Sequence, residues 1–190
     1  LKQCREVDIM NRRQCLQALS ALTVGALLLP RMATASSLLL LPERSLSFNH
    51  LHTGEKLRIT YWAEGNYLPD SLNDINHLLR DFRNNKISPI DTALLDQLAQ
   101  LQTRINKPCE FQIISAYRSP ETNSMLNANS NGVAKRSMHL EGRAIDIRVP
   151  NVPLSILHQQ ALAMSAGGVG YYPKSDFVHV DSGKVRSWGG

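Results

Sequence analysis

The sequence predicts an α+β fold in which helices pack on one face of a small, mainly antiparallel sheet. Short stretches alternate between apolar and polar residues, as half-buried strands do, while longer stretches place apolar residues at helical spacing. The chain has no internal repeat or low-complexity tract, and its 190 residues suffice for one domain with its own core plus a short appendage. The order of the strand-like and helix-like stretches along the chain gives the α+β class.

The first predicted elements are two alternating strands, Arg44–His50 and Leu57–Trp62, on either side of the hairpin signal Thr53-Gly54-Glu55. Pro69 then begins an amphipathic helix, whose apolar residues recur at helical spacing as far as Phe82. The polar residues that follow Phe82 end this helix.

Asp91 caps a second helix, in which leucines recur at helical spacing until Lys107-Pro108 breaks the pattern. Phe111–Ser115 is an apolar strand, and residues 119–129 are predicted to form a third helix. The polar residues 129–137 form a loop.

The last part of the chain is predicted to contain two more strands, Ala144–Val149 and Phe177–Asp181, separated by a helix over 153–166. The glycines of Gly167-Gly168-Val169-Gly170 are predicted to turn the chain toward Tyr171-Tyr172 and the final strand.

The candidate metal ligands fall on the polar faces of these two strands. Alternation places Asp146 opposite the apolar face of its strand, and His179 occupies the equivalent position in the later strand. A carboxylate in mid-strand is costly to bury alone, and His139, seven positions earlier, can share a cation with it. Two histidines and an aspartate are the ligand set of catalytic zinc sites, which keep a fourth position for water. We therefore predict one zinc ion on His139, Asp146 and His179.

The N-terminus has the features of an export signal. The paired arginines Arg12-Arg13 precede an apolar stretch, Ala18–Leu29, that is too short to span a bilayer comfortably, and Ala33-Thr34-Ala35 resembles a cleavage site. Residues 1–35 are therefore predicted to be a twin-arginine-type signal peptide, with Met10 as a natural start. An uncleaved membrane anchor is the alternative. The prediction implies export to a bacterial periplasm, with no stable membrane anchor after cleavage.

Charge and cysteine content fit this division into a leader, a linker over 36–43 and a domain over 44–190. The leader contributes +3 of the formal net charge of +5, from five basic and two acidic side chains, which leaves only +2 for the rest. The domain has no basic run interleaved with aromatic residues, so a nucleic-acid partner is not expected. Because Cys109 is its one cysteine, the domain cannot form an internal disulfide.

The pattern Ser-x-His-x-x-Gly-x-Ala-x-Asp, here Ser137 to Asp146, followed by a histidine in a late strand, resembles the zinc peptidases that cleave bacterial cell-wall peptides. That group includes D-Ala-D-Ala dipeptidases and carboxypeptidases and shares the hedgehog-type zinc fold. Four further stretches resemble the murein endopeptidases within the group: 51–55, 115–119, 166–172 and 177–181. The resemblance covers nearly the whole mature chain, and it implies the same three zinc ligands.

The resemblance also suggests the remaining catalytic groups. In the family an arginine early in the fold stabilises the oxyanion, and it maps onto Arg118, whose guanidinium would hold a developing oxyanion or a substrate carboxylate. Related enzymes carry an acidic residue three positions before the last zinc histidine, which here is Asp176. Strict alternation points Asp176 away from His179 unless the chain bends, whereas Asp181 shares the face of His179. Asp176 is the preferred general base, and Asp181 is either the base or a partner that orients His179.

The implied function is that of a periplasmic, zinc-dependent murein endopeptidase that hydrolyses peptide cross-links of peptidoglycan with a metal-activated water. A D-Ala carboxypeptidase or dipeptidase is one alternative, and a non-catalytic, zinc-stabilised module that binds the cell wall is another. The sequence does not determine the oligomeric state.

Other polar and aromatic residues have simpler explanations. His77 and His158 lie in helices without a ligand partner, and the His50-x-His52 pair is predicted to be exposed rather than metal-bound. Four residues are candidates to line the substrate groove, although tyrosines more often serve packing: Ser137, Tyr117, Tyr171 and Tyr172.

Overall fold

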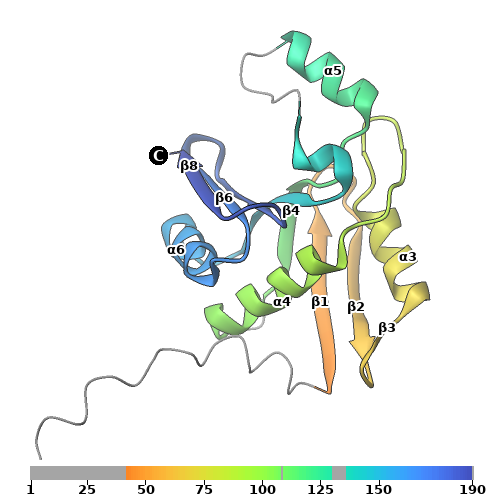
Figure 1. Ribbon diagram of the computed structural model, residues 1–190, viewed down its shortest axis with the longest axis vertical. Coiled ribbons are helices and arrows are strands. Elements are labelled where there is room, and N and C mark those ends of the chain that lie inside the picture. Colours follow the sequence, from red (N-terminus) through yellow and green to blue (C-terminus); the bar gives the residue numbers. More distant parts are fainter. Residues whose placement is uncertain (1–41, 108, 130–135, 190) are drawn as a thin grey trace, which may run out of the picture. The chain divides into compact units, whose positions relative to one another are not determined.

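The computed structural model of the protein describes residues 42–107, 109–129 and 136–189 (Figure 1). The predicted signal peptide and nearly all of the predicted linker lie outside these residues. The described part contains four α-helices and eight strands, which confirms the α+β class.

The strands form one sheet in the order β3-β2-β1-β4-β5-β7-β6-β8. In chain order they are β1 (Glu43–His50), β2 (Lys56–Ala63), β3 (Asn66–Tyr67), β4 (Phe111–Ser115), β5 (Ala144–Arg148), β6 (Gly168–Tyr172), β7 (Phe177–Asp181) and β8 (Arg186–Gly189). Neighbours pair antiparallel except β1 with β4 and β6 with β8, which are parallel. The sheet is thus larger than the small sheet predicted. It is mixed, and five of its seven described pairings are antiparallel, which fits the mainly antiparallel sheet of the prediction.

Two of the helices pack against each other and against the sheet. These are α4 (Thr92–Ile105), which contacts β1, and α6 (Leu154–Met164), which contacts β6 and β7. The helix α3 (Pro69–Leu78) contacts β2, whereas α5 (Pro120–Asn129) extends beyond the sheet (Figure 1).

Alternation along the strands divides the sheet into an apolar face and a polar face. In the paired strands, Phe48 lies opposite Phe111, Ile113 opposite Ile147, and Ile145 opposite Val180. These side chains are fully or almost fully buried, together with leucines of α4 and α6. Burial of such side chains contributes roughly 1.5–3 kcal/mol each. The residues between them, including Asp146 and His179, therefore face the other side of the sheet.

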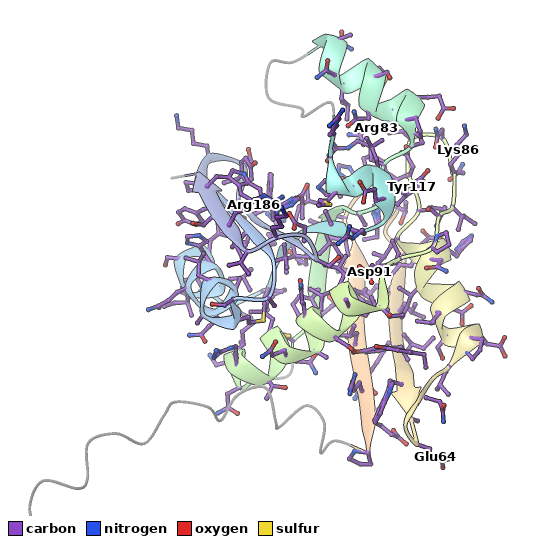
Figure 2. The ribbon with its side chains drawn as sticks, in the orientation of Figure 1. Glu64, Arg83, Lys86, Asp91, Tyr117 and Arg186 are labelled. Carbon is purple, nitrogen blue, oxygen red and sulfur yellow. The ribbon has the colours of Figure 1, made fainter. Side chains whose placement is uncertain are left out.

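The helix α4 begins as predicted. The Asp91 side chain accepts a hydrogen bond from the Ala93 backbone N–H at the beginning of α4 (Figure 2), and Asn106 ends the helix in the left-handed conformation. Asp91 also accepts a hydrogen bond from the Ser182 hydroxyl at 2.6 Å, just after β7. The N-terminus of α4 is thereby fixed to the end of β7, the strand that contains His179.

The helix α3 ends at Leu78, earlier than the periodicity predicts, so Phe82 lies outside it. The chain here is held by distant backbone groups: the Tyr117 N–H donates to the Leu79 carbonyl at 3.1 Å, and the Ser119 N–H donates to buried Asp81 at 2.9 Å. Sequence spacing contains no information about such long-range bonds. Their consequence is that both neighbours of Arg118 are fixed in place.

The glycine-rich stretch before Tyr171 is not the predicted turn but the strand β6, and the sequence analysis missed β8 beside it. A Cβ atom on Gly170 would lie 2.7 Å from the Trp188 indole, and one on Gly168 would lie 2.6 Å from the Arg186 guanidinium. The glycines therefore leave room for two side chains of β8 to lie over β6. This arrangement brings Arg186 and Trp188 to the polar face of the sheet.

The cysteine of the domain is unpaired. Cys109 is a free, buried thiol, and burial raises its pKa to about 11. No helix in the described ranges is long and apolar enough to cross a membrane.

Candidate metal centre

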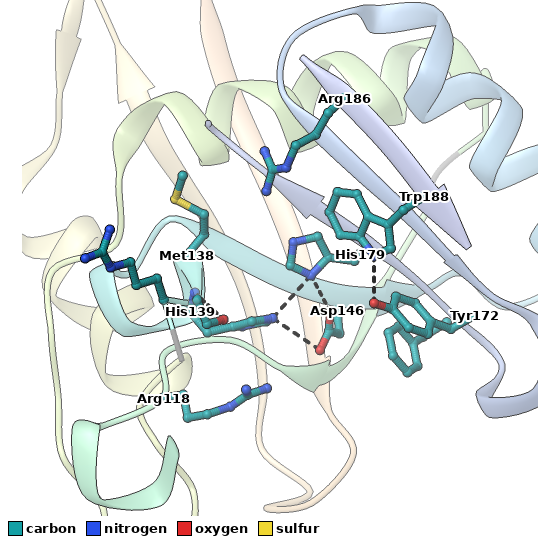
Figure 3. Close-up of a pocket in the computed structure, with 11 residues that line it drawn as sticks. Arg118, Met138, His139, Asp146, Tyr172, His179, Arg186 and Trp188 are labelled. Atoms are coloured by element: carbon teal, nitrogen blue, oxygen red, sulfur yellow. Dashed lines mark hydrogen bonds and ion pairs between the residues drawn. The ribbon is translucent and has the colours of Figure 1, made fainter. Parts of the chain in front are cut away.

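The three predicted metal ligands lie together. The short 3-10 helix η1 (Met138–Glu141) supplies His139, and Asp146 of β5 lies directly opposite His179 of β7 in the antiparallel pairing. One ligand atom from each residue lies within 4.8 Å of the other two, and all three residues are buried (Figure 3). The three side chains grouped in the sequence analysis are therefore close together in the fold.

His139 has a defined orientation and tautomer. Its Nδ1 lies 2.6 Å from the Ala116 carbonyl oxygen, which can only accept, so Nδ1 carries the proton and Nε2 presents its lone pair to the centre. The Ser137 hydroxyl caps the backbone N–H of His139, and Gly142 ends η1 in the left-handed conformation. A Cβ atom on Gly142 would lie 2.2 Å from the Pro89 carbonyl oxygen, so this position requires glycine.

His179 presents its other nitrogen. Its Nε2 donates to the Asp181 carboxylate at 3.1 Å, so Nδ1 faces the centre, 2.8 Å from the Asp146 carboxylate and 3.2 Å from His139 Nε2. Two ring nitrogens and a carboxylate thus converge on one point. A divalent cation that displaces the Nδ1 proton of His179 would bind all three groups at once, and this set of nitrogen and oxygen ligands suits zinc.

Without a cation, His179 and the two aspartates form a network of charged hydrogen bonds. Burial alone would raise the pKa of Asp146, but the charges and hydrogen bonds of His139 and His179 outweigh it and lower that pKa far below its usual range. Burial likewise opposes the imidazolium form of His179, yet hydrogen bonds to Asp146 and Asp181 raise its pKa. The carboxylate stays ionised, as a metal ligand must.

Asp181 is fully buried and accepts hydrogen bonds from four groups. The donors are His179 Nε2, the backbone N–H groups of Gly168 and Gly183, and both terminal nitrogens of Arg186. Burial raises the pKa of Asp181, but these hydrogen bonds outweigh it and lower the pKa well below its usual range. With its lone pairs occupied, the carboxylate is better suited to orient His179 than to accept a proton from water.

Removal of Arg186 tests this orienting role. Arg186→Ala is expected to weaken zinc binding by about 10- to 100-fold, which is the usual loss when a residue that orients a metal ligand by hydrogen bonding is removed. Competition with a chromophoric chelator measures the affinity. The exposed Arg58 of β2, far from β7 in the sheet order, provides the matched control Arg58→Ala, which should bind zinc normally. Unchanged zinc binding in Arg186→Ala would show that Asp181 orients His179 without Arg186.

Arg118 lies beside the cluster, and Figure 3 shows its guanidinium extending toward Asp146. Its backbone N–H donates to the His139 carbonyl at 3.0 Å, so the two residues are fixed to each other. Burial lowers the pKa of Arg118, partly offset by the charge of Asp146. The Nε atom of this guanidinium is buried without a hydrogen-bond partner in the described structure. One terminal nitrogen donates to Asn123 Oδ1 at 3.4 Å. A half-buried guanidinium beside a metal cluster is suited to bind an anion.

Asp176 adopts the left-handed conformation, with φ of 53°, at the end of the 3-10 helix η2 (Pro173–Ser175). Its carboxylate pairs with Arg148 at 2.7 Å, and alternation along β5 places Arg148 on the same face as Asp146. The chain therefore bends at Asp176, and the pair with Arg148 places its carboxylate on the face that carries Asp146. In this structure the Asp176 side chain is exposed and lies outside the pocket lining. Arg148 therefore pairs with Asp176, whereas the Asp146 carboxylate interacts with the two histidines.

The cluster opens into a pocket of about 600 Å³. Ser137 and Tyr172 line it as predicted, whereas Tyr117 and Tyr171 do not. Five further lining residues escaped the sequence analysis: Arg136, Met138, Phe177, Arg186 and Trp188. The last two come from β8, which is too short to give a periodic signal.

The His50-x-His52 pair differs from its prediction, because His50 is buried. Its Nδ1 accepts hydrogen bonds from the backbone N–H groups of His52 and Thr53, while the exposed His52 ring stacks on Phe82. The His50 ring therefore stabilises the hairpin turn.

Comparison with known proteins places this geometry in a family. The profile of the family Peptidase_M15_2, described as peptidoglycan L,D-endopeptidase MepK, matches residues 41–188. The chain belongs to this family. It is 45% identical over 178 residues to the peptidoglycan L,D-endopeptidase MepK of Escherichia coli K12, covering 94% of this chain and 97% of that protein. It is 38% identical over 181 residues to the probable peptidoglycan L,D-endopeptidase MepK of Haemophilus influenzae, covering 95% and 96%.

Proposed function

We propose that this protein is a zinc-dependent endopeptidase that hydrolyses peptide cross-links of peptidoglycan. The observation that carries the proposal is the convergence of His139 Nε2, His179 Nδ1 and the Asp146 carboxylate at an open pocket. The family relationship supports it, because both relatives are named as peptidoglycan L,D-endopeptidases and are matched along almost their whole length. Cross-links of the L,D type are accordingly the first substrates to test.

The three ligands would hold one zinc ion. When bound, this ion would lower the pKa of a coordinated water to about 7 and polarise a carbonyl group. The protein's own residues contribute orientation and charge. Asp181 and Arg186 hold the His179 ring so that Nδ1 faces the centre, and the Ala116 carbonyl holds the His139 ring so that Nε2 faces the centre. The Arg118 guanidinium would bind the oxyanion that develops on the scissile carbonyl.

Asp176 is the proposed proton acceptor for the attacking water. It lies on the metal-bearing face and precedes Phe177, which lines the pocket, but its carboxylate must leave Arg148 to reach a substrate. An exposed ion pair of this kind contributes only about 0–1 kcal/mol, so its loss is easily offset when substrate binds.

Paired substitutions distinguish the two aspartates. Asp176→Asn is expected to lower kcat by about 100-fold or more with normal zinc content, because a general base contributes roughly 10²–10⁴-fold. Asp181→Asn is expected to act mainly through weaker zinc binding. Metal content and initial rates of muropeptide cleavage measure the two effects. Full activity of Asp176→Asn, with Asp181→Asn inactive at normal zinc content, would reverse the assignment.

The proposal includes export to the periplasm, where peptidoglycan lies. Residues 1–35 would be a twin-arginine-type signal, and the mature protein would begin near Ser36 with its domain over 44–190. N-terminal sequencing of the protein recovered from a periplasmic fraction tests this. An intact N-terminus in the membrane fraction would support the uncleaved anchor instead.

The decisive experiment is digestion of purified cross-linked muropeptides, with and without a chelator, followed by mass spectrometry. Conversion of cross-linked dimers to monomers, stopped by chelator and restored by zinc, is the expected result, and the product masses identify the bond. Release of terminal alanine alone would indicate a carboxypeptidase. Intact substrates in the presence of bound zinc would indicate a binding module.

A further inference from the structure

Tyr172 lies on the metal-bearing face beside the cluster. In the pairing of β6 with β7, Gly170 is opposite His179 and Tyr172 is opposite Phe177, so these four positions share one face. The Tyr172 ring stacks on Phe177, with centroids 4.5 Å apart, and Tyr172 lines the pocket. Figure 3 shows its hydroxyl directed back toward Asp146 and His179.

Trp188 fixes this hydroxyl. The indole lies over Gly170 and within 5.2 Å of the His179 ring, centroid to centroid, and its Nε1–H donates to the Tyr172 oxygen at 2.7 Å. An indole nitrogen can only donate, so the Tyr172 oxygen is the acceptor in this bond. The hydroxyl hydrogen of Tyr172 is consequently available, and in the described part of the chain it meets no acceptor.

A hydroxyl that accepts a hydrogen bond becomes a stronger donor, because successive bonds in a chain polarise one another. This series of hydrogen bonds, from the Trp188 N–H to the Tyr172 hydroxyl, ends at the exposed side of the pocket, where the hydroxyl is free to donate to a bound molecule. A peptide substrate offers its carbonyl oxygen for that role, whereas an amide nitrogen accepts poorly. That oxygen gains negative charge during attack by water, so a donor placed there favours the transition state over the bound substrate.

We propose that Tyr172 is a catalytic residue, whose hydroxyl donates a hydrogen bond to the scissile carbonyl oxygen as it becomes an oxyanion, with Trp188 as its positioning residue. The inference rests on the proposed endopeptidase function. Tyr172 keeps its proton throughout: the water oxygen bonds to the carbonyl carbon, the carbon–nitrogen bond breaks, and the leaving nitrogen takes its proton from the water. Arg118 and Tyr172 would then act on the substrate from two sides of the cluster (Figure 3).

The test is Tyr172→Phe, which removes the hydroxyl and keeps the ring on Phe177. We expect kcat on cross-linked muropeptide dimers to fall about 100-fold, the usual effect of removing one oxyanion donor, with KM and zinc content unchanged. A second readout is the affinity for a phosphinate peptide, a tetrahedral mimic of the oxyanion, which should weaken by a similar factor in calorimetry.

The matched control is Tyr171→Phe, because Tyr171 points to the opposite face and stacks on His158. It should retain wild-type kcat and phosphinate affinity. If Tyr172→Phe keeps kcat within about twofold of wild type, or loses activity only together with zinc or folded structure, the proposed role is wrong. An inactive wild-type protein would instead disprove the endopeptidase function, so the two failures are distinct.

Discussion

Asp146→Ala is expected to abolish both zinc binding and hydrolysis. The substitution removes the charged ligand and leaves two imidazole nitrogens, 3.2 Å apart, without the carboxylate that compensates a divalent cation. The zinc affinity should fall by more than about 100-fold, because even the removal of a residue that only hydrogen-bonds to a metal ligand can lower the affinity by that factor. Metal analysis after dialysis and initial rates on muropeptides give the two measurements.

The control for this variant is Asp74→Ala, which removes an exposed aspartate of α3 and should bind zinc and cleave substrate normally. Retention of stoichiometric zinc by Asp146→Ala would show that the metal lies elsewhere. Retention of activity without zinc would contradict the metal mechanism altogether.

Gly167→Ala is expected to cause the largest loss of stability among the glycine substitutions considered for this domain. An added Cβ atom would lie 1.8 Å from the Asp181 backbone oxygen, which belongs to a strand and cannot rotate away as a side chain can. β6 and β7 must separate to accept it, at a cost of about 3 kcal/mol or more in the free energy of unfolding. Urea denaturation of the zinc-free and zinc-loaded protein measures this cost.

Gly54→Ala provides the comparison. Gly54 has a positive φ of 73° but no atom within 4 Å of the added Cβ, so only backbone strain of about 1 kcal/mol is expected. Equal losses for the two variants would mean that the close approach of Asp181 does not determine the stability of β6. A larger loss for Gly167→Ala would confirm that it does.

Two of the three proposed metal ligands could be predicted from the sequence because local alternation defines them. Asp146 and His179 interrupt apolar strands at positions facing away from the core, and this pattern is visible without knowledge of the fold. The hydrogen bonds that select the ligand nitrogen of each histidine were not visible. Ala116 lies 23 residues before His139, and only the folded chain brings its carbonyl to the ring.

The strand β8 and its contribution were missed for a related reason. Four residues cannot show periodicity, and parallel pairing with β6 arises from tertiary contacts. The glycines of β6 suggested a turn because their backbone freedom is the usual signal, whereas here they are required by the Arg186 and Trp188 side chains above them. The early end of α3 has the same kind of cause, in bonds to residues 117 and 119.

The order of the elements along the chain determines which part of the site forms last during synthesis. His139, Asp146 and His179 all precede β8, the last strand of the sheet in chain order, whose Arg186 contacts Asp181 and whose Trp188 contacts Tyr172. A fragment that lacks β8 would keep the three candidate ligands, with Ala116 and Asp181 beside the two rings, and would lose the contacts of Arg186 and Trp188. Completion of these contacts therefore depends on the last strand to be synthesised.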